Sequence, residues 1–336
     1  MTITEAPPVP ATEAGALLRA DDLTQHFDVT VRGKTRTVKA VETVSLELRE
    51  GRCMGLVGES GCGKTTTGRM IVGLDKPTSG EVVLDGVPLR GAAGRVDKKA
   101  RRRVQMIFQD PQSSLDPRMT AAQSVGEPLR VSGVSRRETA ARVTALLERV
   151  GLDDEIGKRM PAALSGGQRQ RLGIARALAL EPSFIVADEP TSALDVSVRA
   201  QVVNLLRDLQ RELGLGMVFI SHDLSTVRYL CDDVAVMYLG RIVEQGPTET
   251  VFGNPQHPYT RALLEAVLVP DPVIEQSRTV VPLQGDLPTA ASVPSGCAFR
   301  TRCPMAADIC AEERPLLLAT GDQRLAACHF AERPES

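Results

Sequence analysis

The sequence predicts an α/β fold with a helical insertion and a small appendage at its C-terminal end. Short apolar runs, such as CMGLVG at 53–58 and FIVAD at 184–188, have the composition of strands buried on both faces. Segments with helical spacing alternate with these runs, and the pattern from about 121 to 180 is mostly helical. After Gly246 the periodicity fades, which marks the start of the appendage.

The elements follow one another along the chain with clear boundaries. VKAVETVSLELREG alternates apolar and polar residues and predicts a half-buried strand that ends at Gly51. The buried strand CMGLVG leads through a glycine-rich turn into the helix TTTGRMIVGL. Further strands are predicted at EVVLDG, VQMIFQ, SFIVAD and MVFISHD, and a helix with a glycine stop at ARVTALLERVGL. A last helix lies between the prolines of GNPQHPYTRALLEAVLVPDP.

The composition excludes several classes of protein. The 336 residues contain 40 Lys and Arg against 42 Asp and Glu, so the chain lacks the positive excess of a protein that coats nucleic acid. Hydrophobic residues make up 42%, enough for a sizeable core, while aromatic residues at 3% are too few for a base-stacking surface. No apolar run approaches about 18 residues, so we expect no transmembrane segment.

The N-terminal region, residues 1–19, predicts a flexible lead-in rich in proline, alanine, threonine and glutamate. It has no basic segment followed by an apolar one, so we expect no secretory signal and a cytoplasmic protein. Structural disulfides are rare in that compartment. Clustered cysteines are therefore interpreted as metal ligands or as small buried residues.

A phosphate loop is predicted between the strand at 53–57 and the helix that follows it. The pattern G-x-x-x-x-G-K-[ST] is matched in the context of strand, turn and helix that the motif requires. Its residues are Gly58, Glu59, Ser60, Gly61, Cys62, Gly63, Lys64 and Thr65, followed by Thr66. Backbone amides at the start of a helix bind phosphate oxygens, Lys64 reaches the β- and γ-phosphates, and the Thr65 hydroxyl ligates Mg²⁺.

A second acidic feature ends the strand FIVAD. Asp188 would support the Mg²⁺ and Glu189 would orient or polarise an attacking water. The motif is weak by itself, because buried strands often end in a solubilising carboxylate. It gains weight only beside a phosphate loop and a further motif.

That further motif begins a helix in the middle of the chain: Leu164, Ser165, Gly166, Gly167 and Gln168. Ser-Gly-Gly at a helix start is a second anion-binding site. The chain thus has two such sites but one lysine-containing loop. We infer that the second site faces a nucleotide held by a partner.

LSGGQ is the signature of ATP-binding-cassette (ABC) transporters, and residues 23–246 resemble their nucleotide-binding subunit. Three further motifs match in the order that the family has: Gln109 of the Q-loop, Ser192, Ala193, Leu194 and Asp195 of the D-loop, and the switch residue His222. The resemblance implies a RecA-like ATPase core with an antiparallel β subdomain and a helical signature subdomain at about 111–178. The nucleotide-binding domain would span 20–250.

The resemblance also implies a mechanism. Two such domains close head to tail around two ATP molecules, each bound by Lys64 and Thr65 of one copy and by the signature Ser165 and Gly167 of the other. Glu189 is the implied general base, His222 contacts the γ-phosphate, and Gln109 senses the Mg²⁺ that Thr65 and Asp188 also hold. Phe27 is the candidate ring for stacking on adenine, with an ordinary core position as the alternative.

Two further runs, HPYTRALLEAV at 257–267 and RVQMIFQDPQSSLDPRMT, resemble the ATPases of dipeptide and oligopeptide importers. This branch implies a second ATPase subunit (a copy or a paralogue), two membrane permease subunits, an extracytoplasmic binding protein, and a place at the cytoplasmic face of the plasma membrane. Nickel, glutathione or sugar remain alternative solutes. A DNA-repair or chromosome-maintenance ATPase is disfavoured, because 109–164 leaves no room for a long coiled coil, and we expect no nucleic acid partner. A regulatory subunit that binds ATP without hydrolysing it is disfavoured because Glu189 and His222 are both present.

Four cysteines crowd the predicted C-terminal extension, 251–336: Cys297, Cys303, Cys310 and Cys328. A chance set of buried thiols is one interpretation, but the neighbours are polar and basic. The close Cys pairs typical of zinc sites are absent, whereas four thiolates at uneven spacing suit an iron–sulfur cluster. Members of the importer branch carry a [4Fe-4S] cluster at such a motif. An iron–sulfur cluster is thus the first hypothesis and zinc the second, with His329 as a neighbouring polar group.

Overall fold

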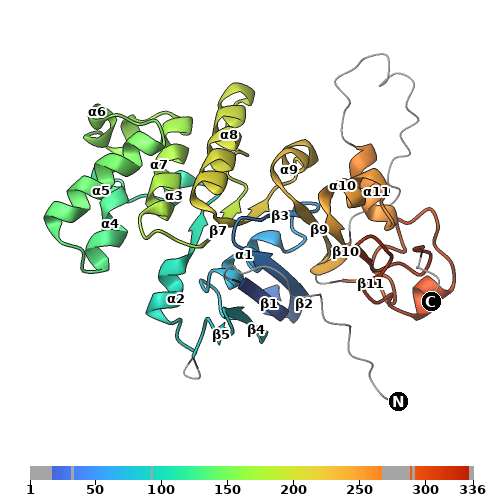
Figure 1. Cartoon of the computed structure of the whole chain (residues 1–336). Coiled ribbons are helices and arrows are strands. Elements are labelled where there is room, and N and C mark those ends of the chain that lie inside the picture. Colours follow the sequence, from blue (N-terminus) through green and yellow to red (C-terminus); the bar gives the residue numbers. More distant parts are fainter. Residues whose placement is uncertain (1–16, 32–33, 92–93, 267–287, 290–291, 333–336) are drawn as a thin grey trace, which may run out of the picture.

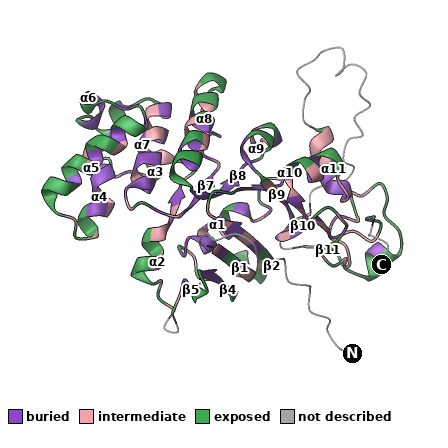
Figure 2. Ribbon diagram, viewed as in Figure 1, coloured by how far each residue is buried: buried purple, intermediate pink, exposed green. Residues whose placement is uncertain are grey.

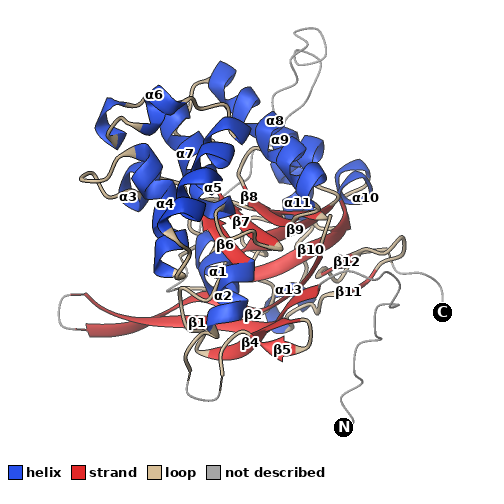
Figure 3. Cartoon of the chain, turned by 60° about the vertical axis from the view of Figure 1, so that its left-hand side comes forward, coloured by secondary structure: helices blue, strands red, loops and turns tan. Residues whose placement is uncertain are grey.

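The protein is described here from a computed structural model that covers residues 17–31, 34–91, 94–266, 288–289 and 292–332. Two β-sheets lie at the centre of the molecule (Figures 1 and 3). The helices α4 to α7 form a group at one side of the sheets, and the C-terminal region lies at the opposite side (Figure 1). Of the predicted lead-in at 1–19, residues 1–16 lie outside the described residues, and 17–19 already belong to β1.

The first sheet is antiparallel and has the strand order β2-β1-β4-β5. Its strands are β1 (Leu17–Val31), β2 (Lys34–Arg49), β4 (Ser79–Leu84) and β5 (Val87–Pro88). Leu18 pairs with Leu48 on one side and with Leu84 on the other, and all three are buried. The alternation of apolar and polar residues thus places one face of this sheet in the core, and the predicted antiparallel subdomain is confirmed.

The second sheet has the order β11-β12-β10-β9-β3-β8-β7-β6. Five strands form its parallel part: β3 (Cys53–Val57), β6 (Val104–Ile107), β7 (Phe184–Asp188), β8 (Gly216–Ile220) and β9 (Asp233–Tyr238). β10 (Arg241–Pro247) pairs with β9 antiparallel. Every residue of β3, β7 and β8 is buried, as expected for central strands covered on both faces. The carboxyl ends of the parallel strands therefore meet at one edge of this sheet, where α/β proteins bind ligands.

Helices cover the parallel strands. They are α1 (Lys64–Ile71), α8 (Val196–Leu213), α9 (Leu224–Leu230) and α10 (Thr248–Gly253), with the short exposed α2 (Lys98–Arg103) before β6. Asp195 caps α8 by accepting the amide of Val198 at 3.0 Å, and Gly214 ends the helix in the left-handed region. The predicted α/β core is confirmed.

The helical part consists of α3 (Pro111–Ser114), α4 (Ala121–Val131), α5 (Arg136–Arg149), α6 (Asp154–Gly157), the 3₁₀ turn η1 (Pro161–Ala163) and α7 (Gly166–Leu178). Thr120 and Ser165 begin α4 and α7 with complete capping boxes, which fix the first turn of each helix. Buried faces of these helices, purple in Figure 2, pack together and against the core.

The C-terminal region contains α11 (Pro258–Glu265), α13 (Ile309–Glu312), β11 (Leu318–Ala319) and β12 (Leu325–Ala326). β12 pairs with β10 through Gln245 and Leu325, so the region continues the central sheet. Residues 267–287 lie outside the described part of the chain. The predicted appendage therefore shares a sheet with the ATPase-like core.

Candidate active site

The predicted phosphate loop lies between β3 and α1 and packs tightly against two other strands. Gly58 and Gly63 have φ of 150° and 104°. A Cβ atom would lie 2.1 Å from the Met237 carbonyl oxygen at Gly58 and 2.3 Å from the Ala40 carbonyl oxygen at Gly63. Glycine is therefore required at both positions, by conformation and by space.

Lys64 and Thr65 begin helix α1 directly after the loop. The Lys64 ammonium is buried and donates to the carbonyl oxygens of Gly58 and Glu59 at 2.8 and 2.9 Å, so it lies over the loop. The Thr65 hydroxyl donates to Oδ1 of Asp188 at 3.0 Å. Burial raises the pKa of the Asp188 carboxyl above its ordinary value. A hydroxyl and a buried carboxylate at the end of a phosphate loop form the donor pair that Mg²⁺–nucleotide sites use.

The three residues predicted for hydrolysis meet at the carboxyl ends of three strands. Glu189 follows β7, Gln109 lies two residues after β6, and His222 lies two residues after β8. The Gln109 amide donates to Oε2 of Glu189 at 3.0 Å, and Nδ1 of His222 lies 3.4 Å from Oε1 of Glu189. Neighbouring parallel strands thus place one carboxylate between an amide and an imidazole.

The backbone at Glu189 is held in an uncommon conformation. Its φ is 40°, and a non-glycine residue with positive φ marks a site worth attention. The Glu189 amide donates to the Ile220 carbonyl at 3.0 Å, and the Ser192 hydroxyl donates to the Glu189 carbonyl at 3.1 Å. These bonds hold the backbone of Glu189 in this conformation.

The signature residues lie at the start of α7, in the helical part. Leu164 is buried, whereas Ser165 is exposed, and its hydroxyl accepts the amide of Gln168 at 3.3 Å. The Ser165 amide in turn donates to Oε1 of Gln168 at 2.9 Å. The D-loop packs beside them: a Cβ on Gly166 would lie 3.4 Å from Cδ2 of Leu194. An exposed Ser165 agrees with a site completed by another subunit.

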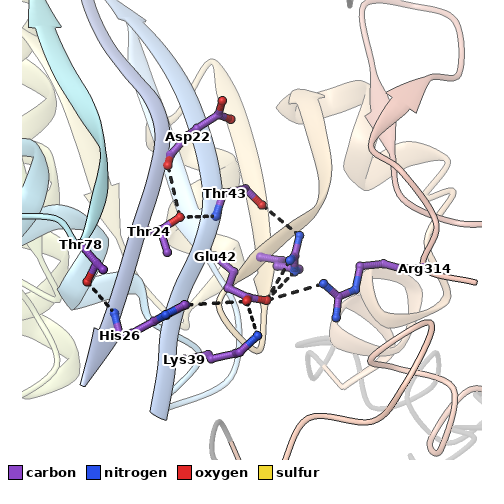
Figure 4. A network of polar contacts seen from close by, with 9 residues as sticks. Asp22, Thr24, His26, Lys39, Glu42, Thr43, Thr78 and Arg314 are labelled. Carbon is purple, nitrogen blue, oxygen red and sulfur yellow. Dashed lines mark hydrogen bonds and ion pairs between the residues drawn. The ribbon is translucent and has the colours of Figure 1, made fainter. Parts of the chain in front are cut away.

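Phe27 lies on β1 and is 42% exposed, so the alternative of an ordinary core position is wrong. The neighbouring His26 lies 3.7 Å from Glu42, which also pairs with Lys39 and Arg241 (Figure 4). Burial raises the pKa of Glu42, but the bonds from Lys39 and Arg241 outweigh it and lower that pKa to about 2. Arg314 of the C-terminal region approaches the same carboxylate at 3.6 Å.

The four C-terminal cysteines lie within electrostatic range of one another. The amide of Cys297 donates to the carbonyl of Cys310 at 2.8 Å. Burial raises the pKa of the Cys297 thiol, and the other three thiols raise it further. Among the described residues, however, no group of three or more His, Cys, Asp or Glu side chains is arranged to hold a metal ion. The predicted metal centre is therefore not confirmed.

Two residues of the C-terminal region contact the phosphate loop, and sequence analysis did not predict either contact. The Glu59 amide donates to the Tyr259 hydroxyl at 2.8 Å, and both Glu59 carboxylate oxygens pair with Arg302. Tyr259 lies in the run HPYTRALLEAV, where its spacing predicts only an amphipathic helix. Separations of 200 and 243 residues carry no local signal that could have found these contacts.

Comparison with solved structures identifies the class of protein. The structure of the ATP-binding cassette MJ0796, in a dimeric post-hydrolysis state with ADP and Pi, has a TM-score of 0.60 to this chain at 30% identity, over 69% of this chain and 98% of that one. The structure of cbiO1 from Clostridium perfringens, part of the ABC transporter complex cbiONQ, has a TM-score of 0.61 at 29% identity, over 71% of this chain and 92% of that one. Residues 41–192 match the family model described as ABC transporter.

Sequence relatives extend the match into the C-terminal region. The oligopeptide transport ATP-binding protein OppF of Escherichia coli is 51% identical over 90% of this chain and 92% of its own length. A protein of Sinorhizobium fredii named "Probable peptide ABC transporter ATP-binding protein y4tS" is 50% identical over 94% of this chain and 90% of its own. Residues 243–310 match the model of the oligopeptide/dipeptide transporter C-terminal region. The chain belongs to the family of ABC transporter ATP-binding proteins. No helix in the described ranges has the length and apolarity needed to cross a membrane.

Proposed function

We propose that this chain hydrolyses ATP and thereby energises an importer of peptides. The observation that carries the proposal is the meeting of Glu189, Gln109 and His222 beside the phosphate loop. Relatives of nearly full length that are named for peptide and oligopeptide transport support the choice of solute. Nickel, glutathione and sugars remain the alternative solutes.

In the proposed mechanism, some residues of the site bind ATP and others assist proton transfer. The loop amides from Gly58 to Thr66 and the Lys64 ammonium bind the phosphates, and Phe27 stacks on adenine. Glu189 accepts the proton of the attacking water, His222 contacts the γ-phosphate, and Gln109 orients the Glu189 carboxylate. Thr65, Asp188 and Gln109 would hold Mg²⁺, which neutralises phosphate charge when bound.

A second subunit, either a copy of this chain or a paralogue, completes each site with its own signature residues. The exposed hydroxyl of Ser165 supports this part of the proposal, since it can reach a ligand outside its own chain. The dimeric state of the MJ0796 cassette is the matching precedent. Two permease subunits and an extracytoplasmic binding protein would complete the importer, with this chain at the cytoplasmic face of the membrane.

The four cysteines are proposed as the ligands of a [4Fe-4S] cluster, with zinc as the alternative. Burial raises the pKa of the Cys297, Cys303 and Cys328 thiols, and the amides of Phe299, Met305 and Phe330, each bonded to the thiol two residues earlier, offset part of that rise. Amide bonds to sulfur also tune iron–sulfur centres. Protein purified without oxygen should be brown and contain about four iron atoms per chain. Colourless protein with one zinc per chain would reject the cluster.

The transport proposal is tested by reconstitution. The chain is purified with the membrane subunits that accompany it and is placed in liposomes with the matching binding protein. ATP enclosed in the liposomes, with the binding protein outside, should drive uptake of a labelled dipeptide or oligopeptide in preference to nickel, glutathione or a sugar. Uptake of one of those solutes alone would change the assigned substrate, and absence of ATP hydrolysis would overturn the function.

A further inference from the structure

We propose that Tyr259 and Arg302 of the C-terminal region are positioning residues for the phosphate loop, and that ATP affinity depends on them. The proposal rests on the proposed function, in which this loop binds ATP. Both residues act on Glu59, the second residue of the loop. Neither belongs to the set of motifs that mark the nucleotide site.

Glu59 is fixed at its amide, its carbonyl and its side chain. The amide donates to the Tyr259 hydroxyl at 2.8 Å, and the carbonyl accepts from the Lys64 ammonium at 2.9 Å. The two carboxylate oxygens pair with the two terminal nitrogens of Arg302 at 2.8 and 2.9 Å. This bidentate pair is the geometry that most restricts both partners.

The two positioning residues are themselves rigid. Tyr259 is fully buried, and its amide donates to Nδ1 of His257 at 3.1 Å. Its ring lies 4.6 Å from that of Tyr238 and 5.5 Å from that of Phe299. The Arg302 side chain is only 7% exposed, and its amide donates to the Phe299 carbonyl at 2.9 Å. The loop is therefore held against a packed aromatic cluster.

The charge of Glu59 explains why Arg302 matters for ATP. A carboxylate in a loop that binds phosphates repels the ligand, and it also competes for the Lys64 ammonium. Arg302 cancels that charge and directs the carboxylate toward the C-terminal region. Without Arg302, the repulsion should grow with the number of phosphate charges, so ATP should be affected more than ADP.

The experiment measures ATP and ADP dissociation constants of the full-length chain, together with KM and kcat in the assembled transporter. Tyr259→Phe removes one hydroxyl and should raise the Kd for ATP roughly threefold to tenfold. Arg302→Gln should raise it roughly tenfold, with a smaller rise for ADP. Since neither residue touches the reacting atoms, kcat at saturating ATP should stay within about twofold.

A compensating variant separates charge from general damage. The double variant Glu59→Gln/Arg302→Gln removes both charges and should recover most of the affinity lost in Arg302→Gln. Arg300→Gln and Tyr229→Phe are the matched controls. Arg300 lies in the same loop, and its guanidinium donates to Ser295; the Tyr229 hydroxyl donates to Asn204 on the surface. Both controls should bind ATP as the unaltered chain does.

Several outcomes would overturn the proposal. One is an unchanged Kd in both Tyr259→Phe and Arg302→Gln. Another is a double variant that binds ATP no more tightly than Arg302→Gln does. A third is an equal loss of ATP and ADP affinity in Arg302→Gln. If Arg302→Gln fails to fold, Tyr259→Phe decides alone. Failure of the proposed function has a different signature, because the unaltered chain would then bind no ATP.

Discussion

The nucleotide site and the C-terminal region share one sheet but differ in what places their key residues. In the nucleotide site, short motifs at strand ends carry the chemistry, and Glu189, Gln109 and His222 meet because their strands are neighbours. In the C-terminal region, packing places Tyr259 and Arg302 against Glu59. The first kind of residue acts on a ligand, whereas the second acts on other residues.

This difference predicts how substitutions divide. Changes at the strand ends should reduce turnover while the fold stays stable, because we propose that those side chains contact the reacting groups. Changes in the C-terminal region should alter affinity, stability or pH response and leave the chemical step nearly intact. Substitutions in both regions test this division.

The largest effect is expected at Glu189. Replacing Glu189 with Gln keeps the shape and removes the base, so kcat for ATP hydrolysis should fall by roughly 10²- to 10⁴-fold. Phosphate release by the assembled transporter is the measurement. Glu181→Gln is the control, because Glu181 is an exposed carboxylate whose side chain is 78% accessible and pairs with Arg142. Turnover above a tenth of the unaltered value would show that another group is the base.

The next effect is expected at Thr65. Thr65→Val removes the proposed Mg²⁺ ligand and leaves the buried Asp188 carboxylate without its hydroxyl donor. The Mg²⁺ concentration for half-maximal ATPase activity should rise by roughly tenfold, as for loss of a hydrogen bond to a charged group. Thr37→Val is a matched control, since Thr37 makes the same kind of bond to Asp28 on an exposed hairpin. An unchanged Mg²⁺ dependence would remove Thr65 from the metal site.

A smaller effect concerns pH and the C-terminal region. Burial lowers the pKa of His257 from 6.5 to about 3, so the folded protein holds the neutral imidazole. As the pH falls below about 6.5, the unfolded chain binds a proton that the folded one does not, and stability decreases. At pH 5 this costs about 2 kcal/mol. The loss should be absent at pH 8.

The variant His257→Asn isolates this effect. Asn is a common residue at a helix start and can accept the Tyr259 amide, but it does not titrate. Urea unfolding gives the free energy of unfolding at pH 8 and at pH 5. Its decrease between these two pH values should be about 2 kcal/mol smaller in His257→Asn than in the unaltered chain. Other groups, such as the buried Glu244, contribute equally to both proteins. An equal drop in both proteins would show that His257 does not control this response.

The smallest effect is expected for the ion pair between Arg228 on α9 and Glu249 on α10. The two side chains are 55% and 69% exposed, with 2.6 Å between charged atoms. Exposed pairs of this kind contribute little to stability, because water and salt screen the charges. A double-mutant cycle with Arg228→Gln and Glu249→Gln measures the coupling by urea unfolding. A coupling energy well above the error of the cycle would contradict the assignment of this contact as weak.

Much of the fold and the site could be predicted from sequence, because a buried strand or a phosphate loop requires particular residue types at neighbouring positions. Gly58 and Gly63 are required where the loop touches other backbone, and a Cβ would collide at both. Asp188 ends the apolar strand β7 and Glu189 follows it, and the run of apolar residues is visible in the sequence because β7 is buried. The metal centre at the four cysteines was predicted from their spacing and from the resemblance to importer ATPases, and neither fixes where the thiols point.

The sequence by itself determined the class of protein, the strand, loop and helix that contain the phosphate loop, and the three residues that meet at the carboxyl ends of β6, β7 and β8. Only the tertiary structure decided that the C-terminal region joins the central sheet through β12 and contacts the phosphate loop through Tyr259 and Arg302. The physical reason is that motifs encode contacts with a ligand, whose chemistry is fixed. A contact between residues 243 positions apart depends on how the whole chain packs, and no short stretch of sequence contains that information.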